Sequence, residues 1–255
     1  MIPARATLAG SRLHLTTTPE LEPGRELPWR LLPLNGSLPA GCRLVLDADG
    51  NPELQVEIGR GESATAGSSV AEACHLLDLD VALPRSTKSE DEAGELGPWI
   101  QMLEEDGWST KQLPGRGQGL AFEAQGVRQF VELQPASGGL RLAVEIVRDD
   151  RISPIAREAI ATLLLRGARS LPIVRAAGLS DERSDSARFE ALVGGEPSMP
   201  AVEPAVGGLV LASTLFRREA QALMHDPLAL AYLTTTTQGR LKWDSNQEPA
   251  LTCSK

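Results

Sequence analysis

The chain has 255 residues, of which 42% are hydrophobic and 23% charged, enough apolar material for a soluble core. Its 25 basic and 34 acidic side chains give a net charge of −9, and no Lys/Arg cluster stands out, which argues against a nucleic-acid partner. No stretch approaches the about 18–20 uninterrupted apolar residues of a membrane-spanning helix, so we expect no membrane span.

The first third of the chain predicts strands. Alternating or short apolar runs occur at 13–18, 29–34, 43–47 and 53–58. Pro33 limits the second run to a sheet edge, because proline cannot donate a ladder hydrogen bond. The run of turn residues at 47–52 predicts a β-hairpin between the last two strands. A short helix is expected at 70–77.

The second part predicts a regular alternation of helices and strands. Ser153 is a suitable N-cap for an amphipathic helix, and Pro154 suits its first turn. In chain order we expect a helix at 98–106, strands at 119–125, 127–134 and 140–147, a helix at 153–171, strands at 173–177 and 187–193, and a helix at 202–224. We expect Ile160 and Leu164 to pack on the strand that carries Leu142 and Val144. The polar residues from Thr234 onward read as a frayed tail.

These patterns predict an α+β fold with antiparallel sheets packed against helices. The expected division is a β-rich half at 1–84, an acidic linker at 85–97, an α+β domain at 98–233 and a flexible tail at 234–255. The pentapeptides at 54–58 and 142–146 are nearly the same and lie 88 positions apart. They indicate either a degenerate internal repeat in the first half or a chance agreement of common residues.

The search for chemistry is mostly negative. Cys42, Cys74 and Cys253 are widely separated, which favours a reduced, cytoplasmic setting over a disulfide framework. Cys74 is followed by His75, but neighbours in a helix point in different directions, so the pair does not predict a nucleophile. The three histidines follow no metal-binding spacing, and no nucleophile-elbow or phosphate-loop motif occurs. We expect no catalytic residue, metal or cofactor.

The order of elements in the second part is helix, three strands, helix, two strands and a long final helix. It is carried by residues 99–106, 120–147, 155–171, 173–193 and 202–224. This arrangement resembles class I type III secretion chaperones and their YbjN-like relatives. The resemblance implies a non-enzymatic module that binds another polypeptide, partly by strand addition, and that is generally homodimeric. Because this chain is about twice the family's usual length, a monomeric pseudo-dimer is the alternative to a homodimer.

The expected function is therefore a chaperone-like or adaptor protein that holds an extended or apolar segment of a partner polypeptide, either a client or a second copy. The candidate partner-binding residues are Leu211 and Leu215, which lie off the main apolar stripe of the last helix, and Phe122 and Phe130 on the predicted strands. The alternative is an enzyme or small-ligand-binding protein whose site is assembled from residues far apart in sequence.

Overall fold

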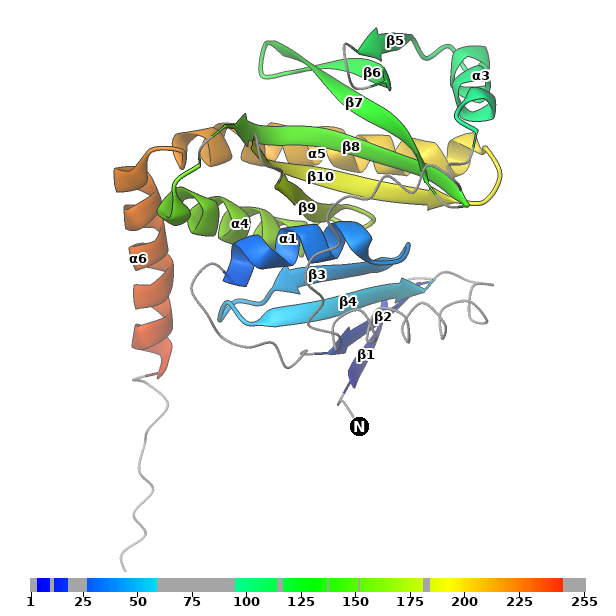
Figure 1. The fold of residues 1–255 in the computed structure, drawn as a ribbon. Helices are drawn as coiled ribbons and strands as arrows, with labels where there is room; N and C mark the ends of the chain where they lie inside the picture. Colours follow the sequence, from blue (N-terminus) through cyan, green and yellow to red (C-terminus); the bar gives the residue numbers. More distant parts are fainter. Residues whose placement is uncertain are drawn as a thin grey trace, which may run out of the picture.

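A computed structural model describes residues 4–9, 12–17, 27–58, 95–113, 117–136, 138–150, 152–180 and 184–244. Within these ranges the chain forms five helices and two antiparallel sheets (Figure 1). The predicted α+β fold class is confirmed. The predicted helix at 70–77 and the acidic linker up to residue 94 lie outside the described residues.

The first sheet has four strands in the order β1-β2-β4-β3. The strands are β1 (Ala4–Ala9), β2 (Arg12–Thr17), β3 (Cys42–Leu46) and β4 (Pro52–Ile58). The predicted turn between β3 and β4 is confirmed: the Asp47 carboxylate accepts a hydrogen bond from the Asn51 backbone N–H at 2.7 Å, and Gly50 has a φ of +80°.

The prediction of an edge strand around Pro33 is wrong, because this segment forms helix α1 (Leu27–Ser37). Pro28 suits the first turn of this helix, and Trp29, Leu32 and Asn35 recur at helical spacing and are all buried. Pro33 is tolerated within the helix. Burial of one helical face therefore outweighs the strand-like alternation of the local sequence.

The second sheet has six strands in the order β5-β6-β7-β8-β10-β9. They are β5 (Thr110–Leu113), β6 (Gly117–Ala124), β7 (Val127–Ala136), β8 (Gly139–Asp149), β9 (Arg175–Ser180) and β10 (Asp185–Gly194). Five of these were predicted. The four-residue β5 was not, because it is too short to show a periodic pattern.

The helices of the second part are α3 (Gly97–Glu105), α4 (Pro154–Ala168) and α5 (Met199–Ala222). Ser153 caps α4 as predicted, its Oγ accepting from the Ala156 backbone N–H at 3.2 Å. The expected burial of Ile160 and Leu164 is confirmed, while the main helix contact of β8 is with α5. Helix α4 lies between the sheets, mainly against α1, α6 (Asp226–Asp244), α5, β3 and β9 (Figure 1).

The last helix, α6 (Asp226–Asp244), occupies residues 234–244, for which a frayed tail was predicted. The hydroxyls of Thr234 and Thr235 each donate to the backbone carbonyl four residues earlier, at 2.8 Å. These bonds satisfy the polar side chains within the helix, so the run of threonines does not end it. Residues 245–255 lie outside the described part.

The two halves of the chain share one hydrophobic core. Helix α1 packs on β9 of the second sheet, and α4 packs on β3 of the first. Both halves also have the same strand order: α1 joins β2 to β3 in the order β1-β2-β4-β3, and α4 joins β8 to β9 in the order β7-β8-β10-β9. In this correspondence β4 matches β10, not β8. The similar pentapeptides at 54–58 and 142–146 thus lie on strands that do not correspond.

Candidate functional site

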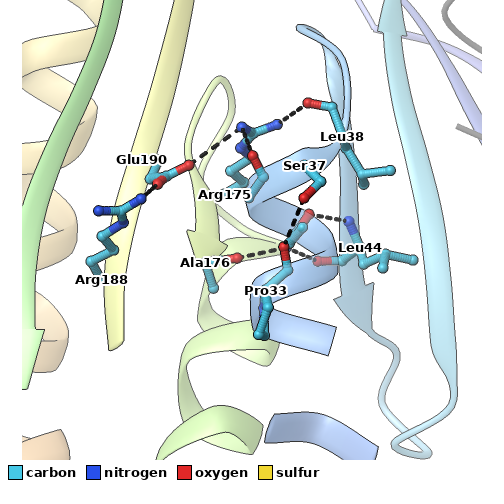
Figure 2. A network of polar contacts seen from close by, with 10 residues as sticks. Pro33, Ser37, Leu38, Leu44, Arg175, Ala176, Arg188 and Glu190 are labelled. Carbon is cyan, nitrogen blue, oxygen red and sulfur yellow. Dashed lines mark hydrogen bonds and ion pairs between the residues drawn. The ribbon is translucent and has the colours of Figure 1, made fainter. Parts of the chain in front are cut away.

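The inner edge strands β3 and β9 lie beside each other, and the side chain of Asn35 bridges them. Asn35 is fully buried. Its Nδ2 donates to the carbonyls of Leu44 on β3 (2.8 Å) and Ala176 on β9 (2.7 Å), and its Oδ1 accepts from the Leu44 N–H at 2.7 Å (Figure 2). A single carboxamide thus satisfies backbone groups of both sheets at the join.

A buried charge cluster lies next to this join (Figure 2). The guanidinium of Arg175 donates to the carbonyls of Leu38 (2.6 Å) and Gly36 (3.0 Å) and pairs with Glu190 at 3.3 Å. Arg188 pairs with the other carboxylate oxygen of Glu190. All three charged side chains are buried, so the cluster is the strongest candidate for a polar site inside the described part of the molecule.

The electrostatics of the cluster do not suit acid–base catalysis. Burial alone would raise the pKa of Glu190, but the guanidiniums of Arg188, Arg175 and Arg141 outweigh it and hold that pKa below its ordinary value. Burial also lowers the pKa of Arg175, against the attraction of Glu190. A general acid or base needs a pKa near the working pH, and the pKa of Glu190 is displaced away from it. By its contacts the cluster connects β9 and β10 to the end of α1.

Arg43 makes the reciprocal contact from the first half. Its Nη1 donates to the carbonyls of Leu171 and Val174 (3.1 Å to the latter), just beyond the end of α4. Its Nε donates to Gln55 of β4 at 3.1 Å. Burial lowers the pKa of Arg43, although Glu57 opposes this. The guanidinium of one arginine from each half thus binds backbone carbonyls at or beyond the C-terminal end of the helix of the other half.

The cysteines and histidines, from which the sequence predicts neither a nucleophile nor a metal site, fall only partly within the described residues. No group of three or more His, Cys, Asp or Glu side chains is placed there to hold a metal ion. Cys42 is buried within β3 and His225 is exposed before α6. Cys74, His75 and Cys253 lie outside the described residues.

The four predicted partner-binding residues do not form one surface. Leu211 and Leu215 are 49% and 50% exposed on α5. Phe122 and Phe130 are partly buried on β6 and β7. The structure therefore offers two separate places where a partner could bind, the outer side of α5 and the hairpin formed by β6 and β7.

The two phenylalanines lie on opposite faces of the hairpin. Phe122 is directly opposite Gln129 in the ladder, and Gln129 accepts hydrogen bonds from Ser213 and Arg217 of α5, so Phe122 lies on the α5 side. Phe130 follows Gln129 in the strand and points to the other face, where the Arg128 guanidinium lies 5.8 Å from its ring centroid.

The outer edge of β6 is only half covered. Strand β5 pairs with Gly117–Leu120, and within the described residues no strand pairs with 121–124 on that side. In Figure 1 the end of the β6–β7 hairpin extends beyond β5. Of these four residues Ala124 is buried, whereas Glu123 is exposed and the other two are partly exposed. This leaves a short open strand edge between Phe122 on one face and Phe130 on the other.

Comparison with known protein families, curated proteins and solved structures finds no match to this chain. In the described part, α5 is long and apolar enough by composition to cross a bilayer, a property that it shares with many core helices of soluble proteins.

The residues that join the halves were missed by the sequence analysis, although a signal for them exists. The nine residues at 31–39 and 164–172 read Leu-Leu-Pro-Leu-Asn-Gly-Ser-Leu-Pro and Leu-Leu-Arg-Gly-Ala-Arg-Ser-Leu-Pro, with five identities. Both segments run from a helix toward the next strand, and each strand carries one of the reciprocal arginines. A search for repeats at this spacing of 133 positions, instead of 88, would have brought Arg43 to within one position of Arg175, which lies 132 residues further on.

Proposed function

We propose that the protein is a non-enzymatic, chaperone-like or adaptor module of the cytoplasm that binds an extended segment of another polypeptide along the open edge of β6. The observation that carries this proposal is the half-covered strand, in which residues 121–124 have no outer neighbour among the described strands. Backbone groups at such an edge pair readily with an incoming strand. The apolar side chains beside the edge supply selectivity.

The side chains around the edge suit a segment with alternating apolar residues. Phe122 lies partly buried on the face that α5 covers, where it packs against the core. On the opposite face only the small Ala121 separates Phe130 from the edge, because the two residues are cross-strand partners. Successive side chains of an added strand point to opposite faces, so alternate positions would lie near one phenylalanine or the other.

The order of elements supports a chaperone-like interpretation. The succession α3, β6, β7, β8, α4, β9, β10, α5 is the arrangement in which the second half resembles class I type III secretion chaperones and YbjN-like proteins. The chain differs by the additional strand β5, which covers part of the outer edge. The exposed remainder of β6 is then the place where strand addition, which the resemblance implies, is geometrically open.

We also propose that the two halves descend from one duplicated unit and form an internal pseudo-dimer. Three observations support this: the shared strand order, the matching segments at 31–39 and 164–172, and the reciprocal arginines. The cross-strand neighbours of the arginines also correspond, since Arg43 faces Gln55 and Arg175 faces Glu190. A duplicated chain would carry within one molecule the pairing that two subunits provide in a homodimer.

The proposal is tested by hydrogen exchange with a synthetic, unstructured peptide that alternates valine with threonine. Binding should slow amide exchange in residues 121–124 and leave α5 unchanged. Phe122→Ser should lower the affinity for the peptide by roughly fivefold or more, the usual effect of truncating an anchoring aromatic side chain. Leu228→Ser, at an exposed leucine of α6, is the matched control and should have no effect. Protection elsewhere, or equal binding by the Phe122 variant, would contradict the proposal.

A further inference from the structure

The outer side of α5 is an apolar helix face that nothing in the described part of the chain covers. Within the most apolar window of this helix only 33% is buried, whereas a core helix of this composition would be mostly enclosed. Pro204, Gly207, Leu211 and Leu215 follow one another at spacings of three and four residues, so they share a side of the helix, and all are exposed. No charged residue occurs between Glu203 and Arg217.

Two adjacent glycines in this helix have different surroundings. A Cβ at Gly208 would lie 2.8 Å from the Val174 side chain, so packing within the molecule explains that glycine. A Cβ at Gly207 would meet nothing within 4 Å. Glycine in a helix interior costs about 1 kcal/mol relative to alanine, and no contact in the described structure compensates for it at this position. The close approach of another chain at Gly207 would compensate for this cost.

We propose that this face binds the same face of a second copy of the chain, with the two α5 helices antiparallel about a two-fold axis. If the axis passes at residue 209, Leu211 of each copy lies over Gly207 of the other, so each leucine fills the space above a glycine. A self-complementary patch of this kind is what an isologous dimer requires. The turn at the end of the β6–β7 hairpin contacts this helix, since Gln125 Nε2 donates to the Thr214 carbonyl at 2.7 Å, so the proposed dimer face lies beside the open edge of β6.

The charges at the two ends of the face favour this partner and this orientation. Glu203 and Arg218 are both exposed and lie near opposite ends of α5. In the antiparallel arrangement residue 203 of one copy faces residue 215 of the other, which places Arg218 only about one helical turn further along. Opposite charges therefore meet at both ends of the interface. An anionic bilayer would be repelled by a chain of net charge −9.

The test is the solution mass of the full chain over a range of concentrations, measured by light scattering and sedimentation. The wild type should approach twice its 27.2 kDa. Leu211→Glu should be monomeric and folded, and Leu228→Glu, at a similarly exposed leucine of α6, should dimerise normally. Gly207→Ala should weaken dimerisation by roughly tenfold or more, since the added methyl occupies the space of the opposing leucine.

A charge exchange tests the orientation. Glu203→Arg and Arg218→Glu should each weaken the dimer, and the double variant should regain most of the lost affinity. A wild type that stays monomeric at all concentrations overturns the proposal, as does a Leu211→Glu variant that dimerises like the wild type. Flotation of the monomeric wild type with anionic lipid vesicles would overturn it in favour of a membrane surface.

Discussion

Arg43 and Arg175 make reciprocal contacts across the join between the halves: each lies on a strand of its own sheet, and its guanidinium donates to backbone carbonyls at or beyond the end of the helix of the other half. Guanidinium donors suit such positions, because one planar guanidinium carries five N–H groups and can donate to two backbone carbonyls at once. The two contacts lock α1 to β9 and the end of α4 to β3.

Replacing either arginine should therefore destabilise the whole chain. Arg43→Met and Arg175→Met each leave buried carbonyls without donors, and hydrogen bonds to charged groups contribute about 1.5–3 kcal/mol each. Because the halves share one core, each variant should unfold in urea in a single transition at a lower midpoint. Arg128→Met, at an exposed position, serves as the control. Two separate transitions would show that the halves are independent.

Asn35→Ala should lower the free energy of unfolding by at least about 1–3 kcal/mol, the penalty for leaving a buried polar group unpaired. The substitution removes three hydrogen bonds to Leu44 and Ala176 without any solvent access to replace them. Gln118→Ala, which removes an exposed hydrogen bond to Gln112, should cost less than about 0.5 kcal/mol in the same denaturant titration. Equal losses in the two variants would contradict the role of Asn35.

Glu190→Gln should cost about 3–5 kcal/mol at neutral pH, because it leaves buried guanidiniums without their anion. The arginines hold the folded-state pKa of Glu190 below its ordinary value of about 4.3, so its ionised form contributes stability above that pH. That contribution is lost as the pH falls through the folded-state pKa. The gap in unfolding free energy between wild type and variant should therefore narrow in acid. Glu123→Gln, at an exposed position, is the control and should cost less than about 0.5 kcal/mol at neutral pH.

Gly167→Ala should destabilise the protein although alanine is the better helix former. A Cβ at this position of α4 would lie 2.5 Å from the ring of Phe216, which itself packs against Phe189 with ring centroids 5.7 Å apart. Overpacking of this kind costs about 1–3 kcal/mol, which exceeds the stabilisation expected from the higher helix propensity of alanine. Gly207→Ala, measured by thermal unfolding in the Leu211→Glu background, should instead be neutral or stabilising. A rise in Tm for the Gly167 variant would show that Phe216 can move aside.

The sequence predicted those elements whose signals are local. Ser153 and Pro154 mark the start of α4, and alternating apolar residues identify β6, β7 and β8. Helix α1 was mistaken for a strand because Pro33 and a short apolar run outweighed the burial pattern of Trp29, Leu32 and Asn35. Its helical state depends on a surface of β9 that local patterns do not show.

The contacts at the join show no local pattern, because Asn35 and Ala176 are 141 positions apart and Arg43 and Val174 are 131 apart. Only the similarity of residues 31–39 and 164–172 relates the two segments in the sequence. Leu211 and Leu215 were identified because an amphipathic helix reveals its outer side by periodicity alone. The length of the open stretch of β6 depends on where β5 ends, and a strand of four residues is too short for its bounds to be predicted from the sequence.

The packing of α1 on β9 also affects how the protein is made. During synthesis α1 and β3 leave the ribosome long before β9. Until β9 has been made, more than a hundred codons later, the apolar face of α1 lacks its packing partner and the carboxamide of Asn35 lacks its hydrogen bond to Ala176. Contacts between residues so far apart in the sequence slow folding, and apolar surface that is prone to aggregation stays exposed until they form. We therefore expect the first half of the nascent chain to depend on molecular chaperones until β9 has been synthesised. In a ribosome–nascent-chain complex stalled before residue 175, the first half should be unfolded.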